Sequence, residues 1–368
     1  MRRSTIVVIV FVVLAALVVG VSQFLRAQPP LELTVAVSPL AERWVRAAVE
    51  RLNATEPVVA STRRLRFSVT PVDDLAVWGD ERRVNWTPEN HPAAWIPASA
   101  QSVDYAVNAR FPFEIASESL ARTPLVWGGF ASRVQVLTGD GAQPFDWPVV
   151  AAAAEAESWA SLGGQSNWGF VKLAFDRPDQ TMSGFAVLLT GAAAYGEAAD
   201  VTQSVTNSAD FRAWFAPVGQ SVANFNTLGA DAAAAMASRG ASVAEVGLLP
   251  ESRWLTNLDG LLRHEPVVLA YPQYPFVFEF PLARWASTPA SAEETEAAQV
   301  LANWLLAEAQ QQSALDAGLR PAAGPAPDTA RLFTAAVDYG ALLDPDLSTA
   351  AAGLSRTEAQ RLLQWFVR

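Results

Sequence analysis

Short apolar runs of strand length alternate along the chain with segments whose apolar residues recur at helical spacing. The clearest runs lie at 31–37, 123–128, 246–249 and 266–271. After the first run, apolar side chains recur every three or four residues as far as Leu52, which indicates an amphipathic helix. Strands that alternate with helices in this way predict an α/β fold.

Small hydroxyl residues stand where predicted strands end and predicted helices begin. Ser38 follows the first strand and is itself followed by a proline, and Ser99 follows a further apolar run. Thr181 and Ser183 precede a long apolar helix. Serine and threonine are preferred N-caps, so each residue by itself is first interpreted as a helix cap. We expect Ser38 to cap the helix that follows the first strand.

The N-terminal segment, residues 1–27, has the pattern of a membrane-targeting leader. Arg2 and Arg3 precede an apolar run at 6–21, whose length is between that of a signal-peptide core and that of a full span. The positive flank places the N-terminus in the cytoplasm and the body outside. We expect an uncleaved single-pass anchor in the cell membrane; a cleaved signal, which would give a secreted protein, is the alternative.

Composition excludes several kinds of chemistry. The 368 residues, enough for two domains, carry a formal net charge of −11, so nucleic acid is a poor partner. The chain has no cysteine, which excludes disulfides, thiolate metal sites and cysteine nucleophiles. His91 and His264 are too few for a histidine-rich metal site. Lys172, the only lysine, lies in no phosphate-binding loop motif, and we expect no cofactor.

The sequence contains no set of residues with the pattern of a known catalytic site. Asp73 and Asp74 form an adjacent pair, but neighbours in sequence generally point apart, whereas a glycosidase needs carboxyl groups that face each other across a cleft. The nucleophile-elbow motif G-x-S-x-G does not occur. We therefore expect that the protein is not an enzyme.

Aromatic side chains offer a different binding chemistry. Most of the 13 tryptophans fall on apolar helical faces, where a core position is the first interpretation. Trp95 and Trp127 lie on predicted strands and are the candidates for stacking against a sugar.

Five segments of the body form an ordered pattern of strands, polar strand ends and helix starts. The first delivers a serine to a predicted helix, and the third contains Asp-Arg-Pro followed by Thr-Met-Ser-Gly. The segments are Leu33–Ser38, Thr123–Trp127, Trp168–Gly184, Val267–Pro272 and Ala298–Pro321. Together they resemble type 2 periplasmic solute-binding proteins, specifically the molybdate-like substrate-binding branch.

The resemblance implies an α/β, two-lobed type 2 periplasmic-binding-protein fold with a hinge of crossover strands, here preceded by the predicted transmembrane helix. Lobe one would comprise 31–122 plus 272–322, and lobe two with the hinge strands would comprise 123–271. The C-terminal extension, 323–368, departs from the family pattern and contains a predicted helix at 356–367. We expect the strand ends of two sheets to face each other across a solvent-filled gap.

The same resemblance implies a ligand site in that gap. Ser38 and Ser99 would face it from lobe one, and Thr181 and Ser183 from lobe two. The N–H groups of helix N-termini hold anions without a lysine, so we expect an oxyanion or a carboxylate-bearing solute, with no metal. Tyr271, which ends the returning strand, is the fifth predicted ligand-binding residue.

The predicted function is therefore capture of a small solute outside the cytoplasm, as the receptor of an ABC-type importer or as a sensor. The expected partners are the solute, the membrane and an ABC transporter permease. The alternative is a cell-envelope interaction module that keeps the fold but has no transport ligand. The C-terminal extension and the permanent anchor leave this alternative open.

Overall fold

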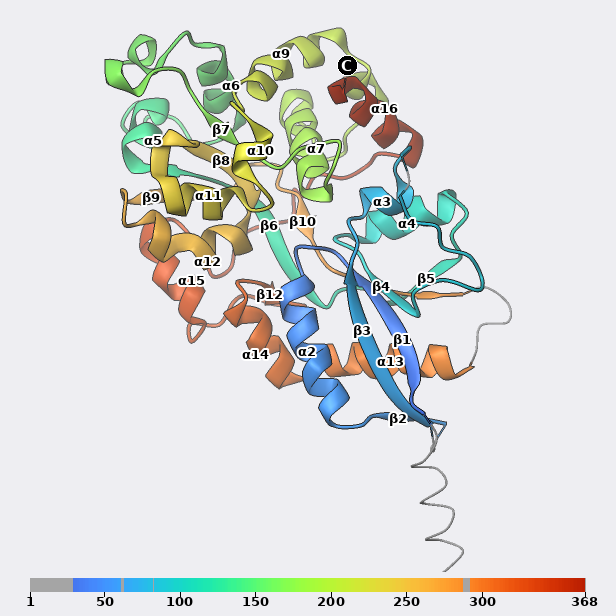
Figure 1. Ribbon diagram of the computed structural model, residues 1–368. Coiled ribbons are helices and arrows are strands. Elements are labelled where there is room, and N and C mark those ends of the chain that lie inside the picture. The colour runs from blue at the N-terminus through green and yellow to red at the C-terminus, as the bar shows by residue number, and fades with distance from the viewer. Residues whose placement is uncertain (1–28, 61–62, 82, 287–291, 368) are drawn as a thin grey trace, which may run out of the picture.

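The computed structural model describes residues 29–60, 63–81, 83–286 and 292–367 (Figure 1). The membrane anchor predicted at 1–27 lies outside these ranges. None of the helices within them combines the length and the apolarity that crossing a bilayer requires.

The first sheet has six strands, and we call the part of the molecule built on it lobe one. Its strands are β1 (Leu31–Val37), β2 (Val58–Val59), β3 (Arg63–Pro71), β4 (Ala94–Ile96), β5 (Phe113–Ser117) and β11 (Leu282–Trp285). They lie in the order β2-β3-β1-β4-β11-β5. β1 pairs in parallel with β3 and β4, so the carboxyl ends of these three strands meet at one edge of the sheet.

The sequence of β1 suits its place inside this sheet. Leu33, Val35 and Val37 alternate along the strand and are buried in the main apolar cluster, whereas Ala36 belongs to a second cluster. This alternation is the pattern of a strand that is covered on both faces. The predicted strand at 31–37 is confirmed, with the same first and last residues.

The second sheet surrounds one long strand, and we call the part built on it lobe two. Its strands are β6 (Ala121–Phe130), β7 (Leu173–Ala174), β8 (Val246–Pro250), β9 (Val267–Ala270), β10 (Val277–Phe278) and β12 (Arg320–Pro321). The main path is β10-β6-β8-β7, and β9 and β12 also pair with β6. The prediction of a mixed α/β protein with two sheets is confirmed.

β6 connects the two lobes. Its first residues pair with β12 and β10, and its later residues pair with β8 and β9. β10 and β12, which the predicted division of the chain assigns to lobe one, both hydrogen-bond to β6, and we call these three strands the hinge strands. The division itself stays a prediction. Near the C-terminal end of β6, a Cβ atom on Gly128 would lie 2.6 Å from the ring of Trp254. Glycine at this position therefore permits the close approach of the Trp254 ring to the strand.

Helices cover both sheets. Those of lobe one are α2 (Glu42–Ala54), α3 (Leu75–Trp78), α4 (Ala100–Asn108), α13 (Ala292–Leu306) and α14 (Glu308–Asp316). Those of lobe two are α5 (Ala131–Thr138), α6 (Trp147–Glu155), η1 (Trp159–Leu162), η2 (Ser166–Trp168), α7 (Met182–Gly196), α8 (Gln203–Thr206), α9 (Ala209–Gln220), α10 (Phe225–Leu228), α11 (Ala232–Arg239), η3 (Gly240–Ser242) and α12 (Glu251–Leu261).

The C-terminal extension packs on the outside of this arrangement. It contains α15 (Arg331–Ala336), η4 (Val337–Tyr339) and α16 (Arg356–Val367). α15 contacts α12 of lobe two, and the chain then returns so that α16 lies near α3 and α4 at the top of lobe one (Figure 1). The terminal helix that the sequence predicts is confirmed with the same bounds.

One expected helix start is wrong. α2 begins at Glu42 with Ala41 as its N-cap residue, so Ser38 does not cap it. The backbone N–H of Ser38 donates to the carbonyl of Ile96 at 2.7 Å, and its carbonyl accepts from the N–H of Ala41 at 3.0 Å. Ser38 therefore continues the pairing of β1 with β4 and then starts a turn, because its backbone bonds belong to the sheet.

The buried apolar side chains of the two lobes form one connected cluster that passes along β6. A second, smaller cluster covers the other face of the first sheet. The two lobes therefore share one core along β6, and the predicted solvent-filled gap between the strand ends can only lie beside it. Trp95 and Trp127 are 0% and 1% exposed, so neither offers a face for stacking on a sugar.

Candidate functional site

The carboxyl edge of the first sheet faces the start of helix α7 in lobe two. Ser38, Asp73 and Ser99 follow β1, β3 and β4, so the parallel pairing brings them to this edge. Across from them, Thr181 caps α7 by accepting a hydrogen bond from the N–H of Gly184 at 3.1 Å. Strand ends and a helix start therefore face each other, as the sequence predicts.

Asp73 of lobe one binds directly to the N-terminus of α7. Both of its carboxylate oxygens lie 3.1 Å from the backbone nitrogen of Met182, which donates to them. The N–H of Leu75 donates to the same carboxylate at 3.0 Å. Burial raises the pKa of Asp73 to about 6, an effect that the two amides partly offset. A carboxylate of the chain itself thus occupies the position that a helix N-terminus offers to an anion.

Asp74 fixes the loop that carries Ser99. Its side chain is 0% exposed and accepts from the N–H of Ala98 at 2.9 and 3.1 Å. Burial, together with the nearby charge of Asp73, raises the pKa of Asp74 to about 8. Ser99 then caps α4 by accepting from the N–H of Ser102 at 3.3 Å. The adjacent acids thus have different structural partners.

A second network supports α7 from within lobe two. The hydroxyl of Ser183 donates to the carboxylate of Asp176, which also accepts from Arg253 at 2.8 Å on both oxygens. Ser183 and Asp176 are buried. These contacts hold the loop before α7 in place, and they use the hydroxyl that the sequence predicts to bind a ligand.

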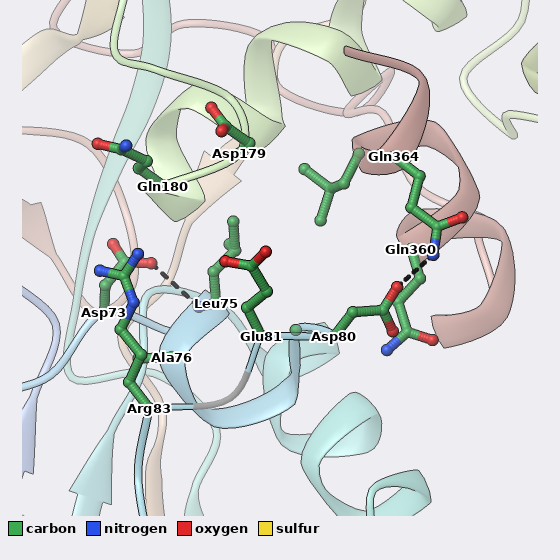
Figure 2. Close-up of a pocket in the computed structure, with 12 residues that line it drawn as sticks. Asp73, Leu75, Ala76, Asp80, Glu81, Arg83, Asp179, Gln180, Gln360 and Gln364 are labelled. Atoms are coloured by element: carbon green, nitrogen blue, oxygen red, sulfur yellow. Dashed lines mark hydrogen bonds between the residues drawn. The ribbon is translucent and has the colours of Figure 1, made fainter. Parts of the chain in front are cut away.

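A cavity of about 360 Å³ opens beside the Asp73 contact, between the two lobes and the C-terminal helix (Figure 2). Its walls come from α3 and the loop after it, from the loop before α7, and from α16. The lining residues are Asp73, Leu75, Ala76, Gly79, Asp80, Glu81, Arg83, Asp179, Gln180, Gln360, Leu363 and Gln364. A volume of this size can hold a small solute.

Acidic groups dominate the charge of the described residues that line this cavity. Asp73, Asp80, Glu81 and Asp179 line it, and Arg83 is the one cation among the described lining residues. Asp80 lies against α16, where Gln364 donates to its carboxylate (Figure 2). Asp179 also forms an ion pair at 2.7 Å with a neighbouring arginine of its loop. The local field therefore favours positively charged or hydrogen-bond-donating groups.

None of the five predicted ligand-binding residues lines this cavity. Ser38, Ser99, Thr181 and Ser183 are brought to the boundary between the lobes, where Ser38, Ser99 and Ser183 are buried. At this boundary, Asp73 and Ser102 of lobe one both contact Met182 of lobe two. Their role in ligand binding stays a prediction.

Tyr271 directly follows β9 and takes part in a different network. Its hydroxyl donates to the carboxylate of Glu251 and accepts from Arg320 at 3.1 Å and from the N–H of Leu342 at 3.1 Å. Burial raises the pKa of Tyr271 above its ordinary range. These partners give the hydroxyl a structural task at the junction of β9, α12 and the C-terminal extension.

Sequence reasoning missed the residues that line the cavity. Asp73 stands out in the sequence as a member of an acidic pair, and its place just beyond a strand parallel to β1 is the signal that could have identified it. Gln360 and Gln364 stand four residues apart on the predicted terminal helix, which puts them on one face. No local signal shows which part of the body that face meets. Within the described ranges, no group of three or more histidine or acidic side chains could hold a metal ion.

No protein-family model matches the sequence, and no curated protein matches it. Solved structures do match the fold. A solute-binding protein of an ABC transporter from Thermotoga lettingae, bound with α-D-tagatose, is 11% identical, with a TM-score of 0.54, over 90% of this chain and 94% of that one. A maltose/maltodextrin-binding domain from Bdellovibrio bacteriovorus, bound to maltotriose, is 12% identical, with a TM-score of 0.53, over 92% of this chain and 100% of that one.

A third match is the cyclic α-maltosyl-1,6-maltose binding protein of Arthrobacter globiformis, which is 13% identical, with a TM-score of 0.52, over 92% of this chain and 94% of that one. These likenesses extend over almost the full length of each chain. They show that this chain has the fold of ABC-transporter solute-binding proteins. The narrower resemblance to the molybdate-like branch stays a prediction.

Proposed function

We propose that this protein is an extracytoplasmic solute-binding protein that captures a small solute between its two lobes, for an ABC-type importer or a sensor. The observation that carries the proposal is the cavity of about 360 Å³, because its walls come from both lobes of a binding-protein fold. A solute bound there would contact both lobes at once and favour the state in which they are close together.

The charge of the cavity decides the class of solute that we propose. Asp80 and Glu81 lie on one wall and Asp179 on another, so a solute with amine or hydroxyl groups would find acceptors on two sides. An anion would meet these carboxylates. An anion held by the start of α7 would also have to displace Asp73 from the amide of Met182. We therefore propose an amine-bearing or polyhydroxylated solute in this cavity, in place of the predicted oxyanion.

The leader supports the proposed location. The apolar run after two arginines favours a single-pass anchor, with the body outside the cytoplasm and near a membrane-embedded permease. A cell-envelope interaction module with the same fold is the alternative, and it would bind no small solute.

A thermal-shift screen followed by calorimetry tests the proposal. The probes are basic amino acids and polyamines, neutral sugars, and the oxyanions sulfate and molybdate. A true ligand at a hundred times its Kd adds about 2.7 kcal/mol of apparent stability. Stabilisation by an amine or a sugar is the expected result. Stabilisation by an oxyanion would overturn the proposed solute class, and stabilisation by none of the probes would favour the interaction module.

Two variants locate the site. Asp80→Asn combined with Glu81→Gln should weaken binding about tenfold or more, because a hydrogen bond to a charged group contributes about 1.5–3 kcal/mol. Asp259→Asn, an exposed position on α12 that does not line the cavity, is the matched control and should bind as the wild type does. Equal affinity in both variants would place the ligand elsewhere.

A further inference from the structure

The last helix of the chain contacts both lobes. On the side of lobe one, α16 makes hydrogen bonds from its first residue onwards. Arg356 and Gln360 donate to the carbonyl of Trp78 at 2.9 and 3.3 Å. Gln364 donates to the carboxylate of Asp80. These contacts join the helix to α3 and to the loop that follows it.

The segment that enters α16 is also bound to lobe one. The carbonyl of Leu354 accepts from the hydroxyl of Tyr105 at 2.8 Å and from the side chain of Gln101 at 3.2 Å, both on α4. Just before it, Ala352 bridges to lobe two, where its carbonyl accepts from the N–H of Val201 at 2.9 Å. The chain thus crosses from one lobe to the other immediately before the helix.

The contacts of α16 with lobe two are of another kind. Trp365 packs against the rings of Phe211 and Phe215, each with centroids 5.8 Å apart. Phe366 meets Phe225 edge to face at 6.3 Å. Both rings are half-buried, and the bridge of Asp200 with Ala352 adds backbone hydrogen bonds to the same lobe. The two sides of α16 therefore differ in kind: side-chain hydrogen bonds hold it to lobe one, whereas aromatic packing and the backbone pairing before it attach it to lobe two.

α16 also forms a wall of the cavity. Gln360, Leu363 and Gln364 line it opposite the loop before α7 (Figure 2). The helix thus closes the same space whose other walls belong to the two lobes. Any increase in the distance between the lobes at this place must break the hydrogen bonds of α16 to lobe one or its aromatic contacts to lobe two.

We propose that α16 is a strap that is anchored on lobe two and holds lobe one, so that the cavity opens when the hydrogen bonds to α3 and α4 break. Gln360 and Gln364 are then residues that face the solute. This last part rests on the proposed function, whereas the holding of the lobes does not.

The cysteine-free chain allows the test by spin labelling of engineered cysteines in the full-length protein. Glu50→Cys on α2 and Ala152→Cys on α6 report the distance between the lobes, because both positions are exposed. Ala152→Cys with Asp259→Cys on α12 reports a distance within lobe two and is the control for correct folding. Pulsed electron–electron double resonance gives the distribution of distances between the two labels of each pair.

The release variant combines Tyr105→Phe, Arg356→Ala, Gln360→Ala and Gln364→Ala. It removes hydrogen bonds to lobe one and keeps the aromatic anchor. We expect the distance between the lobes to shift to longer values and its distribution to broaden, while the distance within lobe two stays the same. Arg361→Ala, an exposed position on the same helix, should change neither. An unchanged distance between the lobes in the release variant would overturn the strap.

A second measurement separates the strap from the solute site. Gln101→Cys on α4 and Ser355→Cys directly before α16, joined by a short bis-maleimide, fix the start of the helix to lobe one, because Gln101 donates to the neighbouring carbonyl of Leu354 at 3.2 Å. Neither position lines the cavity. With a solute found in the screen, the cross-linked protein should bind and release it more slowly than the same variant before cross-linking. Unchanged rates would overturn the role of α16 in admitting the solute. If no solute binds to the wild type, the proposed function fails, and the distance between the lobes still decides the strap.

Discussion

Replacement of Arg320 by methionine tests the contact that joins the hinge to the C-terminal extension. Arg320 lies in β12 and is 1% exposed, and its Nε and Nη2 atoms each donate to the carboxylate of Glu251 at 2.7 Å. The same guanidinium donates to the carbonyls of Leu342 and Leu343 at 2.5 and 2.8 Å. One side chain thus connects β12, α12 and the extension.

The size of the effect follows from burial. Glu251 is 0% exposed, so removal of Arg320 leaves a carboxylate without its cation where water does not reach it. Breaking a buried pair from one side costs about 3–5 kcal/mol, whereas replacing both partners by apolar groups is often close to neutral. We therefore expect Arg320→Met to lower the free energy of unfolding by about 3–5 kcal/mol. Glu251→Met in the same chain should restore much of this loss.

Urea unfolding at pH 7, followed by circular dichroism, measures these differences. Arg46→Met is the matched control, because Arg46 pairs with Glu42 across one helical turn at 2.6 Å and the two side chains are 43% and 32% exposed. Such a pair contributes at most about 1 kcal/mol. The reasoning is refuted if Arg320→Met costs no more than Arg46→Met. It is also refuted if the double variant is as unstable as Arg320→Met alone.

Two further predictions concern Asp74 and Gly128. Burial raises the pKa of Asp74 to about 8 from its ordinary value of 3.8, so the folded state binds the proton more tightly than the unfolded state, and stability falls as pH rises through this interval. We therefore expect the free energy of unfolding of Asp74→Asn, measured relative to the wild type by urea unfolding, to be higher at pH 9 than at pH 5. The same difference between variant and wild type at both pH values would contradict this expectation. Gly128→Ala should cost about 1–3 kcal/mol in the same assay, since its Cβ would meet the Trp254 ring at 2.6 Å. Gly219→Ala, whose Cβ would lie 3.5 Å from Phe366, should be close to neutral; equal losses in the two glycine variants would contradict the packing argument.

The sequence determined those features that depend on neighbours along the chain. The alternation in 31–37 predicted β1, and the helical spacing at the C-terminus predicted α16 with the correct bounds. Ser99 and Thr181 were identified as helix-start residues, and both cap a helix. These features follow from side-chain periodicity and from the demand of free N–H groups for an acceptor, which act over a few residues.

Only the tertiary structure decided what these elements meet. The sequence suggested that the N-terminus of α7 would hold an anion from solution, but the packing of the lobes brings Asp73 to Met182, more than a hundred residues away along the chain. The same packing places Gln364 of the extension against Asp80. Periodicity gives the face of a helix but not the surface that covers it, because that choice depends on the burial of apolar area summed over both lobes.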